Sequence, residues 1–233
     1  MRHKIQSLLV AVSLALPYGL MGQGTFQNLN FEASTVPPLA NGQSGGSVSV
    51  STAFPGWIAY RGTNSASMVF HNDYSIGSVS LSILGPTNST RFEGNFMAVL
   101  QAGGLFSSLP VYAAALAQTG TLPAGIHTIM FYSGFTWPEV TFNGQVIPVV
   151  MLGSGVSSSG TSYEILGGDV GSFAGLSGEL RFTSYAPLGQ FGSLTYLDNI
   201  FFSTQPIPEP STLSLFALGT FLFRHHSRRL TKS

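Results

Sequence analysis

The chain has 233 residues, of which 44% are hydrophobic and 8% are charged, with no cysteine and a formal net charge of zero. A charged fraction about a third of the usual ~25% excludes a charged disordered chain and a helix-rich surface, and no disulfide can support the fold. The zero net charge hides a segregation, because residues 25–205 hold three basic and eight acidic residues, a balance of −5. A mildly acidic domain without lysine is unsuited to nucleic acid, whose phosphates require a basic face.

The N-terminus has the pattern of an export signal. Arg2 and Lys4 form a positive region, residues 5–16 are almost entirely apolar, and glycines follow at the −3 and −1 positions of a cleavage site. Residues 1–24 therefore resemble a secretory signal peptide, and a retained N-terminal anchor is the alternative. The exported domain would then be residues 25–205, which is long enough for one sandwich core.

Between the two ends of the chain the apolar runs are short and bounded by turn residues, which favours strands. We predict strands near Phe26–Glu32, Ser47–Ala53, Trp57–Tyr60, Ser67–His71, Val79–Leu84, Phe96–Gln101, Val111–Gln118, Ile126–Tyr132, Glu139–Phe142, Gln145–Val150, Ser162–Leu166, Gly178–Thr183 and Leu194–Phe202. Asn143-Gly144 predicts a type I′ hairpin turn, residues 153–160 predict a loop, and Asp169 is expected to cap one helical turn over Val170–Ala174. About a dozen strands without intervening helices predict two packed antiparallel sheets.

Three short motifs sharpen this expectation. Asn30-Phe31-Glu32, Pro55-Gly56-Trp57 and Tyr196-Leu197-Asp198-Asn199-Ile200 resemble the opening and closing strands of galactose-binding-like jelly rolls. The resemblance implies an all-β, antiparallel jelly-roll β-sandwich like that of a carbohydrate-binding module. It does not imply that a sugar is bound.

The same resemblance implies a metal site. Glu32 and Asp198 lie in the two strands that such jelly rolls pair at the sheet edge, and acids at the matching places of related modules share a structural calcium with backbone carbonyls. Calcium takes six to eight oxygen ligands, so other groups would complete the site. In the alternative, Glu32 caps a turn, Asp198-Asn199 hydrogen-bonds a neighbouring loop, and no cofactor is bound.

Two tryptophans are the candidate sugar-binding residues, because a flat amphipathic ring suits the face of a pyranose. Trp57 follows Phe54-Pro55-Gly56 and precedes Ile58, so the core is the favoured place for it. Trp137 stands beside Pro138 in a predicted loop, where it is free to bind a ligand. The tyrosines that could join them are Tyr60, Tyr74, Tyr132 and Tyr163.

No pattern in the domain predicts a reaction. The eight acids are scattered, no Gly-x-Ser-x-Gly motif is present, and His71 and His127 lack the spacing of a zinc protease. We therefore expect no enzymatic activity.

The C-terminus combines three parts in order. Residues 206–210, which end in Pro208-Glu209-Pro210, predict an extended handle. Proline fixes its own φ near −65° and disfavours a helical conformation of the residue before it. Residues 212–223 form an apolar, uncharged helix of about 18 Å, shorter than the ~30 Å hydrocarbon core of a bilayer. The basic residues Arg224, Arg228 and Arg229 then favour a cytoplasmic end. A buried core helix is the alternative for the apolar part.

Residues 206–233 resemble the PEP-CTERM sorting signal of exported bacterial proteins, which an exosortase recognises and processes. The resemblance implies that the exosortase, the secretion machinery and the membrane are partners of this chain. We predict an exported, non-enzymatic protein of the cell surface or extracellular matrix, held at the membrane by the C-terminal helix before processing. The alternative is a secreted carbohydrate-binding module for extracellular polysaccharide.

Overall fold

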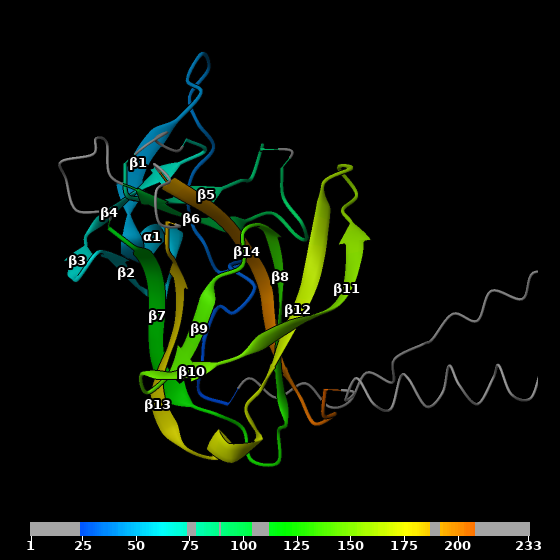
Figure 1. Ribbon diagram of the computed structural model, residues 1–233. Helices are drawn as coiled ribbons and strands as arrows, with labels where there is room; N and C mark the ends of the chain where they lie inside the picture. Colours follow the sequence, from blue (N-terminus) through cyan, green and yellow to red (C-terminus); the bar gives the residue numbers. More distant parts are fainter. Residues whose placement is uncertain (1–23, 74–77, 89, 104–111, 187–191, 208–233) are drawn as a thin grey trace, which may run out of the picture.

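The computed structural model describes residues 24–73, 78–88, 90–103, 112–186 and 192–207. Within these residues the chain is almost entirely β-structure (Figure 1). The elements are β1 (Gly46–Ser49), α1 (Val50–Ala53), β2 (Ile58–Arg61), β3 (Asn64–Ala66), β4 (Met68–His71), β5 (Ser80–Leu84), β6 (Met97–Gly103), β7 (Ala114–Thr121), β8 (Thr128–Phe135), β9 (Glu139–Phe142), β10 (Gln145–Ile147), β11 (Val149–Val156), β12 (Ser162–Asp169), η1 (Gly171–Phe173), β13 (Ser177–Ser184) and β14 (Gly192–Ser203).

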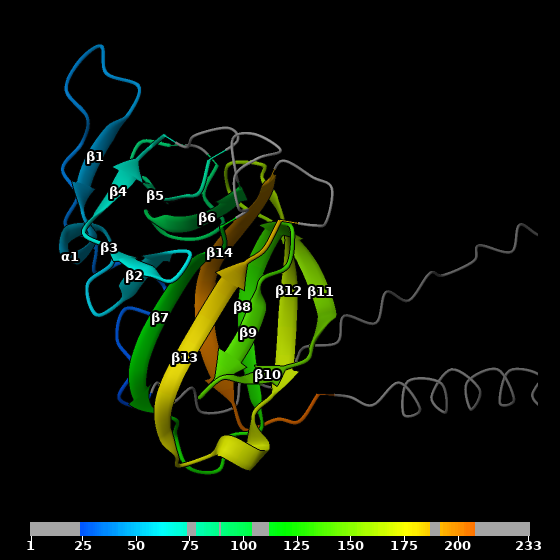
Figure 2. The same ribbon diagram turned by 60° about the vertical axis from the view of Figure 1, so that its left-hand side comes forward.

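The described strands form two sheets. One has eight strands in the order β1-β4-β5-β6-β14-β8-β12-β11, and the other has six in the order β10-β9-β13-β7-β2-β3. Figure 2 shows β7 and β13 of the smaller sheet lying in front of β8 and β14 of the larger one. The predicted all-β class and two-sheet architecture are thus confirmed. The sheets are not wholly antiparallel, however, because β4 and β5 pair in parallel, with Phe70 opposite Ser82.

Two predicted strands are wrong. The chain over residues 26–32 makes turns instead of a strand, because Asn28 and Phe31 adopt left-handed φ values of 51° and 60°. The alternating Ser47–Ala53 run becomes a strand only up to Ser49, whose hydroxyl accepts a hydrogen bond from the N–H of Thr52 (3.2 Å). This bond is an N-cap, and it starts the helical turn α1 in the middle of an alternating pattern.

Local turn signals predicted other features correctly. Asn143 and Gly144 have φ values of 50° and 76°, as a type I′ turn requires, and they join β9 to β10. The helical turn η1 follows Asp169 as predicted, but its N-cap is Val170, and Asp169 Oδ1 only accepts a hydrogen bond from the N–H of Gly171 (2.8 Å). The predicted loop over residues 153–160 is shorter than expected, since β11 continues to Val156.

Aromatic side chains fill the space between the sheets. Phe182 of β13 packs edge-on against Phe131 of β8 in the opposite sheet, with ring centroids 5.2 Å apart. Its other neighbour is Trp57, whose ring centroid is 6.2 Å away. Phe131 and Phe182 have no exposed surface, and burial of such a ring stabilises a fold by roughly 1.5–3 kcal/mol. This core joins the two sheets without any disulfide.

A second, smaller core lies on the outer face of the eight-stranded sheet. Along β6, Ala98 belongs to the main core while its neighbours Met97 and Val99 belong to the second one, so the two cores lie on opposite faces. The buried members of the second core are Leu84, Phe92, Met97, Val99 and Tyr196. Because Phe92 comes from the connection between β5 and β6, this core holds that connection on the sheet.

Candidate functional site

The C-terminal segment leaves the fold directly after the last strand. β14 ends at Ser203, and Gln205 is still held to the domain. Its carbonyl oxygen accepts a hydrogen bond from Thr128 Oγ1 (2.6 Å), and its N–H donates to Ser203 Oγ (3.0 Å). The predicted handle, which starts at Pro206, therefore begins one residue beyond the last fixed point of the domain.

Most residues of the predicted targeting signals lie outside the described residues. They are residues 1–23 of the signal peptide, Pro208, Glu209 and Pro210 of the sorting motif, the apolar segment 212–223, and Arg224, Arg228 and Arg229. Within the residues that are described, no helix is long and apolar enough to cross a membrane.

An acidic cluster forms where the turn after Asn28 meets the start of β6. Glu32 Oε1 accepts hydrogen bonds from the N–H groups of Asn95 (2.7 Å) and Phe96 (2.8 Å), so its carboxylate caps this turn. Gly94 has a φ of 56°, and a Cβ there would collide with the Glu32 carboxylate. Glycine is thus required for the close approach of this loop to Glu32.

Asp198 is the buried member of the cluster. It lies in β14, which runs between β6 and β8 inside the larger sheet. The expectation that its strand lies at the sheet edge is therefore wrong. The side chain is 1% exposed, and its two oxygens accept hydrogen bonds from the N–H groups of Glu93 (3.1 Å) and Asn199 (2.7 Å). The pKa of Asp198 is raised to about 8, mainly because burial disfavours the charged form; the two backbone hydrogen bonds lower it, and the carboxylates of Glu32 and Glu93 raise it.

The second core positions Glu93 in this cluster. The ring of Phe92 lies over Gly134 in β8, where a Cβ would come within 2.8 Å of Phe92 Cζ, and its centroid is 5.3 Å from that of Tyr163. With Phe92 anchored, Glu93 Oε2 accepts a hydrogen bond from Asn199 Nδ2 (2.7 Å). The sequence did not indicate Glu93, because it is brought to Asp198 by tertiary packing across 105 residues.

The negative charge of the cluster suits a cation, but its side chains do not form a complete set of metal ligands. Glu32, Glu93 and Asp198 bring three carboxylates into electrostatic contact around a buried position. Even so, no set of three or more acidic or histidine side chains among the described residues is arranged to hold a metal ion. Backbone carbonyls and water would have to supply most of the six to eight oxygens that calcium takes.

The two candidate tryptophans have different environments. Trp57 is 4% exposed, lies between Phe31 and Phe182, and donates its indole N–H to the carbonyl oxygen of Asn28 (3.0 Å). Its ring is part of the main core, so neither face is open to a ligand. Trp137 is 44% exposed, and its indole N–H donates to the carboxylate of Glu164.

The structure places an additional aromatic residue near Trp137. β9 and β13 are antiparallel with Glu139 opposite Thr183, and Trp137 lies two residues before β9 while Tyr185 lies one residue after β13. Tyr185 is 56% exposed. Its pKa is raised by partial burial and by the carboxylate of Glu139, to which it is hydrogen-bonded. Trp137 and Tyr185 are thus two half-exposed aromatic side chains with different partners, Glu164 of β12 in the larger sheet for Trp137 and Glu139 of β9 in the smaller sheet for Tyr185.

The other candidate tyrosines lie apart from Trp137. Tyr60, on the smaller sheet, lies under the guanidinium of Arg181, whose Cζ is 4.2 Å from the ring centroid. Tyr132 and Tyr163 stack on each other on the larger sheet, with centroids 4.5 Å apart. Tyr74 lies outside the described residues.

Comparison with known families identifies the C-terminal segment. Residues 206–229 match the PEP-CTERM protein-sorting motif, which confirms the resemblance found in the sequence. The chain is therefore a PEP-CTERM-bearing protein, and the motif indicates exosortase-dependent export and sorting to the cell surface. No curated protein matches the chain.

Two solved structures are distantly similar to the domain. TmCBM61 in complex with beta-1,4-galactotriose has a TM-score of 0.39 and 11% identity, over 78% of this chain and 98% of that one. The enzymatically active domain of tailspike protein 4 of bacteriophage CBA120 has a TM-score of 0.23 and 12% identity, over 64% of this chain and only 19% of that one. Likenesses this distant assign neither a ligand nor a reaction to the domain.

Proposed function

We propose that the protein is a non-enzymatic component of the cell surface or extracellular matrix, which an exosortase processes at the segment around Pro208-Glu209-Pro210. The motif match over residues 206–229 carries this proposal. The last described hydrogen bonds to the chain end are those of Gln205, and Pro206 is exposed, so the matched segment begins directly after the last strand. The N-terminal signal starts export, and Arg224, Arg228 and Arg229 keep the end of the chain in the cytoplasm until processing.

Replacement of the three motif residues tests this function. The variant Pro208→Ala, Glu209→Ala, Pro210→Ala is expected to accumulate as a longer, membrane-held species, because the enzyme loses its recognition site while the apolar segment remains. Cell fractionation and immunoblotting measure both changes. Thr204→Ala, an exposed residue just before the matched segment, is the control and should behave as the parent. Identical size and location of the parent and the triple variant would refute exosortase sorting.

A second function, binding of a neutral extracellular polysaccharide, is favoured by the position of Trp137 and Tyr185. The two rings are about half exposed; Trp137 lies just before β9 and Tyr185 just after β13, and each can stack on a sugar ring. The carboxylates of Glu139 and Glu164, which are engaged by Tyr185 and Trp137, can accept hydrogen bonds from sugar hydroxyls. Their negative charge disfavours anionic glycans at this place.

Alanine substitutions test the polysaccharide site. Trp137→Ala and Tyr185→Ala are each expected to weaken binding of a neutral glycan by about tenfold, or ~1.4 kcal/mol. A glycan array followed by isothermal titration calorimetry measures the effect. Tyr112→Ala is the matched control, because Tyr112 is 45% exposed and lies outside the proposed site. Binding that survives both substitutions, or that the control abolishes equally, would place the site elsewhere.

We also propose that a structural calcium ion binds at Glu32 and Asp198, with backbone carbonyls and water as its remaining ligands. The burial of the Asp198 carboxyl supports this proposal, because a cation would stabilise the ionised form that the fold otherwise disfavours. The ion would tie the turn after Asn28 and the β5–β6 connection to the central strand β14. Its role would be stability and not chemistry.

A further inference from the structure

Both ends of the described chain lie at the same end of the sandwich. The N–H of Thr25 donates to the carbonyl oxygen of Thr121 (3.1 Å), and the N–H of His127 donates to that of Ser203 (2.9 Å). The turns after β7 and β12 are joined at the same place, because the N–H of Leu122 donates to the carbonyl oxygen of Leu176 (3.0 Å). We call this region, which comprises Thr25, residues 121–128, residues 169–177 and residues 203–207, the exit end.

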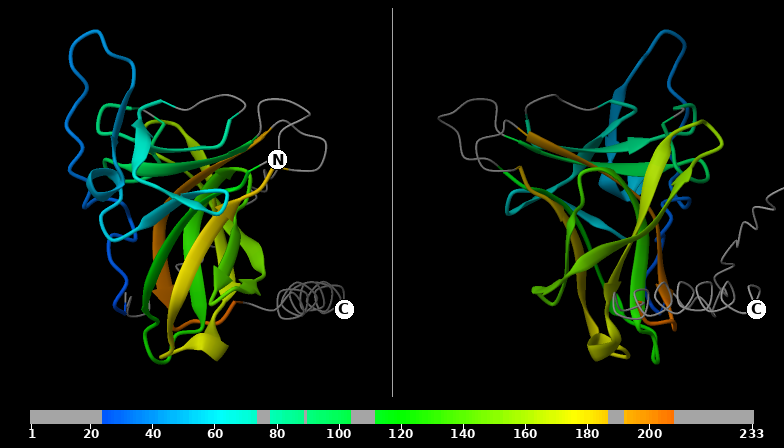
Figure 3. Two further views of the ribbon diagram at one scale, coloured as in Figure 1. Left: turned by 90° about the vertical axis from the view of Figure 1, so that its left-hand side faces the viewer. Right: turned by 45° about the vertical axis from the view of Figure 1, so that its right-hand side comes forward.

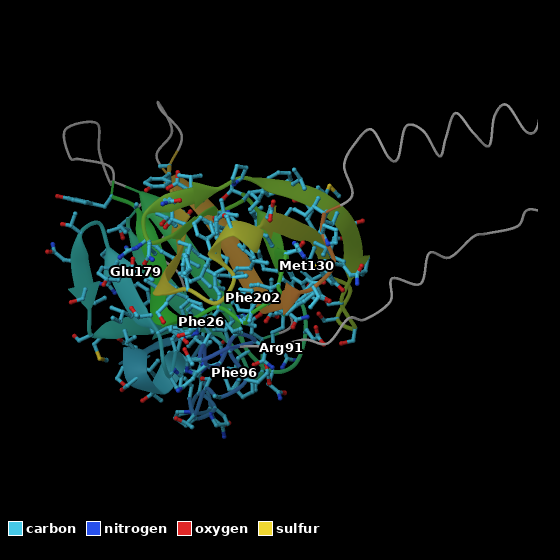
Figure 4. All side chains as sticks on the ribbon, turned by 90° about the horizontal axis from the view of Figure 1, so that it is seen from below. Phe26, Arg91, Phe96, Met130, Glu179 and Phe202 are labelled. Atoms are coloured by element: carbon cyan, nitrogen blue, oxygen red, sulfur yellow. The ribbon has the colours of Figure 1, made fainter. Side chains whose placement is uncertain are left out.

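The figures show the same arrangement. In Figures 1 and 3 the described ends of the chain lie on the side of the molecule that carries η1, while the tip of the β11–β12 hairpin lies on the opposite side. Figure 4 looks at the molecule from the side of η1, with Phe26 and Phe202 near the centre of the view. Their ring centroids are 5.8 Å apart, so the segments that follow the N-terminus and precede the C-terminus pack against each other.

The length of the tether restricts how the domain can face the membrane. The chain is fixed to the domain as far as Gln205, and the apolar segment begins at residue 212. With six residues between them, these two points lie at most about 25 Å apart, whereas the twelve residues of β14 alone extend for about 40 Å. With the apolar segment in the bilayer, the tether is too short for the domain to turn its opposite end toward the lipid. The three prolines between residues 206 and 210 favour an extended chain, which also directs the exit end toward the membrane.

The charge of the exit end suits this orientation. Asp169 is the only one of the eight acidic residues of the domain that lies in it, and His127 is its only other titratable side chain. Anionic headgroups repel an acidic surface, so the domain approaches the membrane most easily at the end that carries the least negative charge. Leu176, which is 51% exposed, adds apolar surface there.

We propose that the exit end faces the lipid surface of the membrane until the chain is processed, while the β11–β12 hairpin points away from it. This inference rests on the proposed sorting function, because it requires the apolar segment in the bilayer. It also places the acidic cluster and the Trp137–Tyr185 region outside the exit end, so ligands can reach both in the unprocessed protein.

Fluorescence quenching by lipids tests the orientation. The chain contains no cysteine, so Ser172→Cys in η1 and Ser158→Cys in the β11–β12 turn each provide a single labelling position, and both serines are exposed. The full, unprocessed chain is labelled with a fluorophore and reconstituted into phosphatidylethanolamine–phosphatidylglycerol vesicles with nitroxide-labelled headgroups. We expect at least twice as much quenching at position 172 as at position 158. A flexible insertion of twenty Gly and Ser residues between Gln205 and Pro206 should remove most of this difference.

The possible results separate the two hypotheses. Equal quenching at the two positions, or stronger quenching at 158, in protein that floats with the vesicles would overturn the orientation and leave the sorting function intact. Protein that does not float with the vesicles would overturn both. Melting temperatures of the two labelled variants within about 2 °C of the parent show that neither substitution disturbs the fold.

Discussion

Without divalent cations, the protein is expected to lose stability as the pH rises from 5 to 8, because folding keeps a proton on Asp198. The folded pKa of about 8 lies above the ordinary value of 3.8. The contribution of Asp198 to stability is therefore fully present below pH 4 and is lost as the pH rises toward the folded pKa. At ~1.4 kcal/mol per unit, the loss over these three pH units is on the order of 4 kcal/mol, or roughly 10 °C in Tm for a domain of this size.

Asp198→Asn separates this effect from all other titrations. The variant carries no titratable group at position 198, so its Tm should change much less between pH 5 and pH 8 than the Tm of the parent. In the parent, each oxygen of Asp198 accepts a hydrogen bond from a backbone N–H, that of Glu93 or that of Asn199. In the variant an NH2 group replaces one of these oxygens, so one of the two hydrogen bonds is lost. The absolute stability at pH 5 should consequently fall, and the slope with pH is the diagnostic quantity. Equal slopes for variant and parent would show that Asp198 is ionised throughout.

Calcium should reduce the loss of stability that the parent shows as the pH rises. An ion that binds only the folded, ionised site stabilises the protein by mass action, and below pH 8 it must also displace the proton from Asp198. Addition of millimolar calcium should therefore raise the Tm more at pH 8 than at pH 5, and Asp198→Asn and Glu32→Gln should abolish the gain. Magnesium, which prefers a smaller octahedral site, is the control ion. A Tm that calcium leaves unchanged at pH 8 would remove the metal proposal.

Features encoded by neighbouring residues were predictable from the sequence, whereas features made by tertiary contacts were not. The turn at Asn143-Gly144 and the helical turn after Asp169 depend on residues within a few positions of each other, and both were predicted. Phe31 adopts a left-handed conformation that its residue type disfavours, so the turns around it could not be read from the sequence. At Ser49, a single capping bond overrides a five-residue alternation.

The candidate sites show the same limit. Glu32 and Asp198 were found through a family resemblance, but the place of Asp198 in a central strand follows from the strand order, which no local pattern specifies. Tyr185 was missed because its relation to Trp137 depends on the register between β9 and β13. The sorting motif was found in full, because it is a linear signal that acts outside the folded domain.

Phe182→Ala is expected to cause the other large effect, a loss of about 3–5 kcal/mol in the free energy of unfolding. Phe182 has no exposed surface and packs against Phe131 of the opposite sheet and Trp57. Removal of its ring leaves a cavity between the sheets that these neighbours cannot fill without leaving their own packing. For a domain of this size, the Tm should fall by at least 10 °C, measured by circular dichroism or calorimetry.

Phe135→Ala is the matched control, since it removes the same ring from a side chain that is 75% exposed. The ring contacts Tyr196 edge-on, with centroids 4.7 Å apart, so its loss should cost less than about 1 kcal/mol. Because the fold has no disulfide and few charged residues, its stability depends on the contacts across the two sheets. Equal effects of the two substitutions would mean that the main core does not dominate the stability, and that other interactions, such as a bound cation, hold the sheets together.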